Sequence, residues 1–365
     1  MHSSFQLAAR GSFIPSQAHT TSIMAASPNL EAKDDASPLT MTVLGCGTMG
    51  IAILGGILSS LDEINSTHSR GPSYPTSGST TPMDDLAGCV LPSRFIACVK
   101  RPESAKKVRQ ALCNNPALEV VRGENVASVD RAEIILLACK PYMVEELLTE
   151  QGMKEALSGK VLVSILAGVS KQQIEGVLGY DDDETEEQKK SRCLIVRAMP
   201  NTAALIRESM TVIATSAPPL PPKVASLVTW IFKKIGDVVY LPPQTMDACT
   251  ALCGSGPAFF ALMLEAASDG AVAMGLPRAE AQRMAAQTML GAASLVLHGD
   301  HPALLRDKVS TPGGCTIGGL LVLEEGRVRG TVARAVREAT VVASQLGQGV
   351  QGVNGTRFNA QQQFQ

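Results

Sequence analysis

Three glycines near the N-terminus have the spacing of a turn that binds the pyrophosphate of a dinucleotide. Gly45, Gly47 and Gly50 form a G-x-G-x-x-G pattern between residues 41–44, which predict a strand, and residues 51–58, which predict a helix. The first glycine permits a tight turn, the second lets a phosphate approach the backbone, and the third lets the helix pack on its strand. Free N–H groups at the helix N-terminus would then face the phosphates. An ordinary turn between strand and helix is the alternative to a cofactor-binding turn formed by Gly45, Cys46, Gly47, Thr48, Met49 and Gly50.

The residues after the next predicted strand, residues 94–99, bear on which dinucleotide is bound. NAD sites usually have an acidic residue there, about 20 residues beyond the glycine turn, whereas NADP sites use basic groups for the 2′-phosphate. Here Lys100 and Arg101 follow the strand, and a Ser-, Thr-, Pro- and Gly-rich stretch at 62–92, expected to be a surface insertion, lengthens the interval. The two cations favour NADPH, with NADH as the alternative cofactor and two solvated loop cations as the alternative structure.

Three further predicted strands end in residues suited to a ligand crevice, because the carboxyl ends of parallel strands line that crevice. The strand at 134–138 ends in Ala138, Cys139, Lys140 and Pro141, and the lysine would lie beside ribose or phosphate. The strand at 161–166 leads into Ala167 and Gly168, which should flank the nicotinamide. The strand at 194–198 leads to Asn201, for which a plain polar turn is the alternative.

The order of these elements predicts an α/β fold in which a Rossmann-type, mostly parallel sheet domain is followed by an all-α domain. Continuous apolar strands that alternate with helices indicate a sheet covered on both faces. From residue 244 onward the periodicity is helical, and the helices at 252–274 and 278–298 are apolar over so much of their surface that burial against another subunit is expected. The predicted divisions are a disordered tail at 1–40, the dinucleotide domain at 41–243, a helical substrate and dimerisation domain at 244–347, and a disordered tail at 348–365.

Composition excludes several other classes. The 365 residues are 45% apolar with a net charge of −2, so no basic surplus indicates nucleic acid or an anionic membrane, and no apolar run approaches a membrane span. The nine cysteines form no CxxC pair and no Cys/His cluster at zinc spacing, so we expect no metal site and thiols buried in a reducing compartment. The first 40 residues are rich in Ser, Ala and Thr but contain a single arginine, which favours a disordered tail and a cytoplasmic protein over a mitochondrial one.

Two later motifs complete a known order. Residues 254–259 read GSGPAF and residues 307–316 read DKVSTPGGCT, and with the motifs above the chain from about 41 to 347 resembles the Δ1-pyrroline-5-carboxylate reductases, the last enzymes of proline biosynthesis. The resemblance implies NAD(P)H-dependent reduction of the C=N bond of pyrroline-5-carboxylate to L-proline. It also implies a homodimer with interlocked helical domains, an assembly of dimers up to a decamer, and an active site between one cofactor domain and the partner's helical domain. Cys139 and Ala203 depart from the usual family residues.

The same resemblance assigns the substrate half of the site. Thr316 would be the catalytic residue, offering its hydroxyl to the ring nitrogen, while main-chain groups of this tract bind the substrate carboxylate. The substrate-binding residues expected are Ser310, Thr311, Gly313, Gly314, Cys315, Thr316 and Asp300, and Lys308 is expected at the cofactor. Asp300 fits an acidic family position only if one gap is allowed, so a solvated loop acid is its alternative.

Other interpretations follow from particular residues. A β-hydroxyacid-type dehydrogenase or another imine reductase would share the two-domain plan, but such dehydrogenases commonly use a lysine of the helical domain, and none lies between Lys234 and Lys308. A dinucleotide-sensing regulator would have lost the 310–316 tract.

Glu265 and Asp269 lie four residues apart on one predicted helix. They could form a proton relay, but a solvated pair or a pair bonded at an interface is the favoured alternative. Ser255 is expected to cap the helix that starts near Pro257.

Overall fold

The computed structural model describes residues 38–68, 90–181, 183–350, 353 and 355–356. The predicted tails at 1–40 and 348–365 and the predicted insertion at 62–92 lie largely outside the described residues. Where the insertion is described, the first helix continues through it as far as His68.

One eight-stranded sheet forms the larger part of the molecule, in the order β3-β2-β1-β4-β5-β6-β7-β8. The pairs from β3 to β6 are parallel, β7 runs antiparallel to β6, and β8 is parallel to β7. This confirms the predicted mostly parallel sheet. The strands are β1 (Leu39–Leu44), β2 (Pro92–Val99), β3 (Leu118–Arg122), β4 (Ile134–Leu137), β5 (Val161–Ser164), β6 (Leu194–Met199), β7 (Ser209–Ala214) and β8 (Gly236–Leu241).

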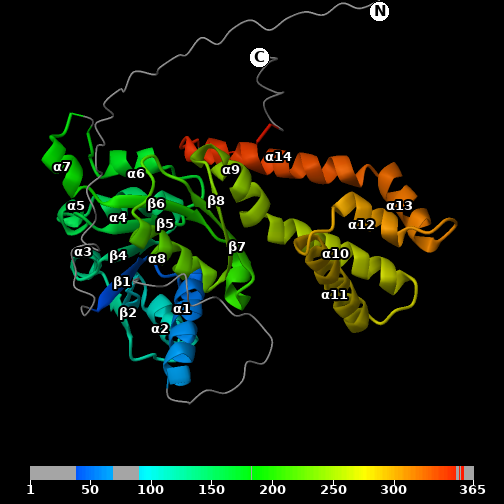
Figure 1. The fold of residues 1–365 in the computed structure, drawn as a ribbon, viewed down its shortest axis with the longest axis horizontal. Coiled ribbons are helices and arrows are strands. Elements are labelled where there is room, and N and C mark those ends of the chain that lie inside the picture. The colour runs from blue at the N-terminus through cyan, green and yellow to red at the C-terminus, as the bar shows by residue number, and fades with distance from the viewer. Residues whose placement is uncertain (1–37, 69–89, 182, 351–352, 354, 357–365) are drawn as a thin grey trace, which may run out of the picture.

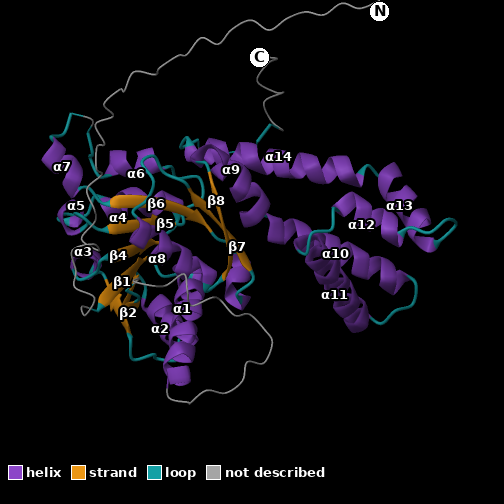
Figure 2. Cartoon of the chain, in the orientation of Figure 1, coloured by secondary structure: helices purple, strands orange, loops and turns teal. Residues whose placement is uncertain are grey.

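Helices cover both faces of the sheet (Figures 1 and 2). Alternate strand residues point to opposite faces, so Met41 and Val43 pack with α1, α2 and α8, whereas Leu44 packs with α3, α4, α5 and α6. The helices of this part are α1 (Thr48–His68), α2 (Pro102–Ala111), α3 (Asn125–Asp130), α4 (Val144–Leu148), α5 (Met153–Ala156), α6 (Lys171–Val177), α7 (Glu186–Ser191) and α8 (Pro222–Lys233), with 3₁₀ turns η2 (Pro141–Met143) and η3 (Thr202–Ile206).

The remaining helices form an arm that leaves the sheet and returns to it (Figure 1). Helices α10 and α11 pack against each other, α12 and α13 lie at the far end, and α14 runs back to pack against α9 beside the sheet. The arm consists of η4 (Pro243–Thr245), α9 (Met246–Cys249), the π-helical turn η5 (Thr250–Gly254), α10 (Gly256–Ala273), α11 (Arg278–Leu297), α12 (Pro302–Val309), α13 (Cys315–Glu325) and α14 (Val328–Gly347).

The arm buries few of its apolar side chains within one chain. Leu262 is 66% exposed, Met274 86%, and Val322 66%. By length and composition alone the helical stretch Pro243–Ala273 would suffice to cross a membrane, so the expectation that no apolar stretch approaches that length does not hold. Exposed apolar surface of this extent on helices also marks an interface with another protein chain.

Several local predictions were wrong. The edge strand β3 was missed. Between β4 and β5, α4 and α5 are two separate short helices, because Gly152 adopts a left-handed backbone with φ +86° between them. The acidic stretch at 180–190 contains most of α7, whose N-terminus is closed by a capping box of Thr185 and Gln188. Ser255 stands at the N-cap of α10 but its side chain makes no capping hydrogen bond, because the preceding residues already form the π-helical turn.

Candidate active site

The glycine turn joins β1 to α1, and each of its three glycines has a different neighbourhood. Gly45 has φ +75°, and a Cβ there would lie 2.6 Å from the Cα of Cys139. A Cβ on Gly50 would lie 3.0 Å from a methyl carbon of Val43, so helix and strand pack closely there. A Cβ on Gly47 would meet nothing closer than 3.9 Å, the carbonyl oxygen of Gly45. The turn is therefore tight on its inner side and open at Gly47, which is the shape that a bound pyrophosphate requires.

Register across the sheet brings the other predicted cofactor residues to the same edge. Leu44, the last residue of β1, pairs with Cys98 on one side and Leu137 on the other. The N–H of Cys46 donates to the carbonyl oxygen of Cys98 at 3.0 Å, and the N–H of Ala138 donates to that of Leu44 at 2.9 Å. Four neighbouring strands thus lead into predicted cofactor residues at this edge: the glycine turn, Lys100–Arg101, Ala138–Pro141 and Ala167–Gly168. Cofactor binding by these residues remains a prediction.

Three buried thiols lie beneath this edge. Burial raises the pKa of Cys46 to about 12, and burial raises the pKa of Cys98 and of Cys139 to about 11 each. All three side chains are therefore neutral at pH 7, so they add no negative charge where phosphates would bind. The turn and the helix N-terminus fit a dinucleotide, and the thiols pack as small apolar groups.

The basic residues predicted at the cofactor differ in whether their charge is already paired within the chain. The ammonium of Lys100 forms an ion pair with Glu146 of α4 at 2.6 Å, and both side chains are largely exposed. Arg101 is exposed and stands at the N-cap of α2 without a side-chain capping bond. Lys140 is exposed at the start of η2. Arg101 is thus the stronger candidate for a 2′-phosphate contact.

Asn201 has a local structural role. Its side-chain oxygen accepts a hydrogen bond from the N–H of Ala203 at 3.0 Å and caps η3, and its own N–H donates to the Ser209 hydroxyl at 3.0 Å. This is the polar turn that the sequence left open as the alternative to a cofactor contact.

The predicted substrate tract lies on the arm, between α12 and α13. Gly313 has φ +66°, and the N–H of Gly314 donates to the carbonyl oxygen of Thr311 at 3.1 Å, which forms a tight turn. Helix α13 begins at Cys315, so Thr316 stands in its first turn, half-buried. The hydroxyl of Ser310 is used locally, since it donates to the carbonyl oxygen of Arg306 at 2.8 Å.

Two acids assigned from the sequence are paired on the arm itself. Asp300 accepts from the ammonium of Lys308 at 2.6 Å, so these two predicted site residues contact each other. Asp269 pairs with Arg278, which favours the structural interpretation of Glu265 and Asp269 over a proton relay. Among the described residues no group of three His, Cys, Asp or Glu side chains could hold a metal ion.

Within one chain the substrate tract and the glycine turn do not meet, because α12 and α13 lie at the end of the arm away from the sheet (Figure 1). Helix α14 lies instead beside the edge of the sheet where the predicted cofactor residues gather. A cavity of about 910 Å³ is lined by this helix and by the loop after β5. It is lined by Ala167, Gly168, Thr250, Ser255, Phe259, Thr331, Arg334, Ala335, Glu338, Ala339, Val342, Ala343, Leu346 and Thr356.

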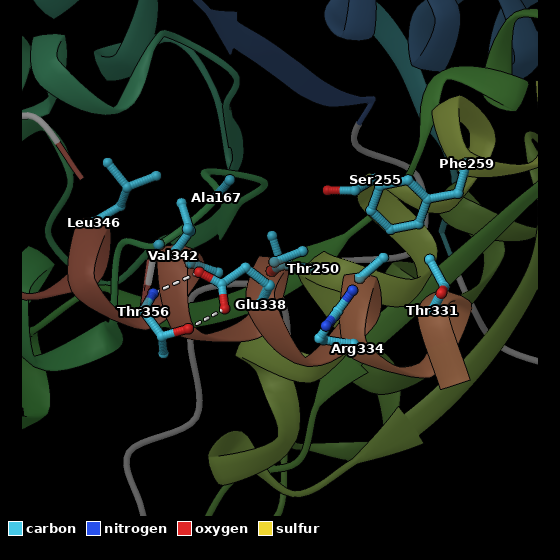
Figure 3. Close-up of a pocket in the computed structure, with 14 residues that line it drawn as sticks. Ala167, Thr250, Ser255, Phe259, Thr331, Arg334, Glu338, Val342, Leu346 and Thr356 are labelled. Atoms are coloured by element: carbon cyan, nitrogen blue, oxygen red, sulfur yellow. Dashed lines mark hydrogen bonds between the residues drawn. The ribbon is translucent and has the colours of Figure 1, made fainter. Parts of the chain in front are cut away.

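The α14 side of this cavity was not predicted from the sequence. Arg334 and Glu338 come from α14, and the return of α14 to the sheet places them here (Figure 3). The Glu338 carboxylate accepts hydrogen bonds from the N–H and the hydroxyl of Thr356, at 2.5 and 2.6 Å. Glu338 and Thr356 are 18 residues apart in the sequence, and helical periodicity gives no signal for a contact between them.

The sheet, its glycine turn and the helical arm define an NAD(P)-dependent oxidoreductase of the Rossmann type. A family model described as NADP oxidoreductase, coenzyme F420-dependent, matches residues 85–168, and one described as pyrroline-5-carboxylate reductase dimerisation matches residues 243–346. A pyrroline-5-carboxylate reductase of Lophium arboricola is 64% identical over 325 residues, 89% of this chain and 98% of the relative. One of Neurospora crassa is 58% identical over 338 residues, 88% and 97% of the two chains. The chain belongs to the pyrroline-5-carboxylate reductase family.

Solved structures agree on the fold. A Plasmodium falciparum pyrroline carboxylate reductase with NADP bound superposes with a TM-score of 0.64 at 24% identity, covering 85% of this chain and 98% of that one. A 1-pyrroline-5-carboxylate reductase of Streptococcus pyogenes gives 0.63 at 25% identity, covering 84% and 99%. The sheet and the helical arm are thus shared with these proteins along nearly their whole length.

Proposed function

We propose that the protein reduces the C=N bond of Δ1-pyrroline-5-carboxylate to L-proline, with NADPH as the preferred hydride donor. The observation that carries the proposal is full-length membership of the family together with an intact glycine turn and an intact 307–316 tract. The β-hydroxyacid dehydrogenase and sensor alternatives have no comparable support.

In the proposed reaction the chain supplies binding, orientation and electrostatics, and a bound nicotinamide dinucleotide supplies the hydride. The turn at Gly45–Gly50 binds the pyrophosphate, and Ala167 and Gly168 place the nicotinamide. The hydroxyl of Thr316 holds the ring nitrogen of the substrate, and the N–H groups near Gly314 bind its carboxylate. Protonation of that nitrogen makes the neighbouring carbon electrophilic, so groups that favour the protonated form lower the barrier.

The proposal is tested by following cofactor absorbance with pyrroline-5-carboxylate, with NADPH and NADH compared at equal concentration. Turnover with proline as product is expected, faster at low cofactor concentration with NADPH. Absence of turnover with both cofactors would contradict the proposed reaction.

The preference for NADPH depends on Arg101. Its guanidinium is exposed at the strand end and fits a phosphate with two parallel hydrogen bonds. Arg101→Ala is therefore expected to raise the KM for NADPH by about tenfold or more while the KM for NADH changes less than about twofold. Lys107→Ala, further along α2 and also exposed, is the control and should change neither value. Equal effects of Arg101→Ala on the two cofactors would refute the 2′-phosphate contact.

We further propose that two copies pair through the arm as an interlocked homodimer, that dimers assemble further to a decamer, and that the active site is completed by the partner's substrate tract. The support is the exposed apolar surface of the arm, the dimerisation model over residues 243–346, and the separation of the two halves of the site in one chain. A cytoplasmic location remains our proposal from composition.

Leu262→Glu tests the pairing, since a carboxylate on this exposed apolar side chain of α10 cannot be buried between helices without a large cost. Sedimentation should show monomers in place of dimers, and turnover should be lost because each chain then holds half a site. Lys190→Glu on α7 leaves the arm unchanged and should keep the wild-type mass and turnover. A fully dimeric Leu262→Glu variant would count against this interface.

A further inference from the structure

The loop after β5 and the last turn of α14 meet backbone to backbone. A Cβ on Gly347 would lie 2.5 Å from the carbonyl oxygen of Gly168, and a Cβ on Gly168 would lie 3.2 Å from the nitrogen of Gly347. Gly168 has φ +73°, whereas Gly347 is an ordinary helical residue, so only the close approach requires glycine at 347. The two glycines therefore form a contact that no other residue pair could make without moving one of the segments.

Gln173 closes the contact from a third segment. Its side-chain oxygen accepts from the N–H of Ser170 at 2.6 Å, in the capping box of α6. Its side-chain nitrogen donates to the carbonyl oxygen of Gly347. One amide thus fixes the start of α6 and the end of α14 together. Because α6 begins three residues beyond Gly168, the loop between them is held at both ends.

This junction connects the two halves of the molecule at the cavity. Ala167 and Gly168 of the loop line the cavity together with Ala343 and Leu346 of the last turns of α14. The family models divide in the same way, since one ends at residue 168 and the other covers residues 243–346. Any shift of the junction changes the distance between the loop and the arm.

We propose that Gln173 and Gly347 are positioning residues for hydride transfer, which hold the Ala167–Gly168 loop at a fixed distance from the helical arm. This inference rests on the proposed function, in which that loop places the nicotinamide. Hydride transfer depends steeply on the separation of donor and acceptor, and a misplacement of about 1 Å costs roughly a hundredfold in rate. The junction therefore acts on kcat more than on the binding of either reactant.

The test compares two capping boxes, of which only that of α6 makes this contact with Gly347. Gln173→Glu keeps an oxygen that accepts from Ser170 but loses the donor to Gly347, and places a carboxylate against its carbonyl. Gln188→Glu makes the same change in the equivalent box of α7, where the side chain bonds to Thr185. We expect Gln173→Glu to lower kcat about tenfold, with cofactor KM within about twofold, and to increase the isotope effect seen with cofactor deuterated at the transferred hydride.

A second measurement does not depend on turnover. Amide hydrogen exchange across residues 165–170 should accelerate in Gln173→Glu and stay at the wild-type rate in Gln188→Glu. Gly347→Ala should have the same effects as Gln173→Glu, and Gly176→Ala, whose Cβ would meet nothing within 4 Å, should have none.

The outcomes separate the two proposals. Wild-type protein that does not reduce pyrroline-5-carboxylate overturns the proposed function, and the exchange measurement still decides whether the junction holds the loop. Faster exchange without a fall in kcat overturns the positioning role. Equal behaviour of Gln173→Glu and Gln188→Glu in both measurements overturns the junction itself.

Discussion

Gly47→Ala is expected to weaken dinucleotide binding by about 10- to 100-fold while leaving the fold intact. A Cβ at this position meets no atom of the protein closer than 3.9 Å, so the change costs no packing energy. The same methyl group occupies the open side of the turn, where a pyrophosphate must come within hydrogen-bonding distance of the backbone. Loss of one charge-assisted hydrogen bond accounts for about 1.5–3 kcal/mol, which corresponds to the expected change in affinity. Titration of cofactor fluorescence, with a thermal melt of the free protein, measures both quantities.

The neighbouring glycine provides the contrast. Gly45→Ala forces a left-handed backbone on alanine and brings its Cβ to 2.6 Å from the Cα of Cys139, a backbone atom that cannot move aside. Overpacking and backbone strain together should destabilise the free protein by about 2–5 kcal/mol. A Gly47→Ala variant that melts as early as Gly45→Ala would show that Gly47 serves the fold and not the ligand.

Thr316→Val is expected to lower kcat by about 10- to 100-fold with cofactor affinity unchanged. Valine has nearly the same shape as threonine, so α13 should form as before, but the hydroxyl proposed to hold the charged ring nitrogen is lost. A hydrogen bond to a charged group contributes about 1.5–3 kcal/mol, and this difference applies to the transition state. Steady-state kinetics with saturating cofactor measures kcat, and direct titration measures the cofactor Kd.

Two variants control this prediction. Thr316→Ser keeps the hydroxyl and should retain most of the activity. Thr340→Val removes a hydroxyl that donates to the carbonyl oxygen of Val336 within α14, so turnover should stay near wild type. Wild-type kcat in Thr316→Val would remove the residue from the mechanism.

The two halves of the proposed site rest on different kinds of signal in the sequence. The cofactor half depends on short-range signals, since a glycine turn and a strand end are each encoded within a few residues. The register of β1 with β2 and β4 then brings these signals together at one edge. The substrate half was assigned by resemblance, and one chain alone does not bring α13, which contains Thr316, to that edge (Figure 1).

For some of the predicted site residues the structure adds a partner that the sequence does not indicate. The sequence predicts Lys100 and Lys308 at the cofactor, and within the chain they contact Glu146 and Asp300. Asn201 satisfies the turn that contains it. Strand β3 was not predicted because this edge strand is short and partly exposed, so that its apolar pattern is weak.

The amino-acid sequence by itself determined the mostly parallel sheet, the glycine turn after its first strand and the change to helices after residue 243, because periodicity and turn chemistry are local properties. Only the tertiary structure decided that α14 returns to the loop after β5, that Gly168 and Gly347 touch, and that Gln173 bonds across them. The physical reason is distance along the chain. These contacts join segments more than 170 residues apart. The local sequence pattern of each segment does not indicate which distant segment folding will bring against it.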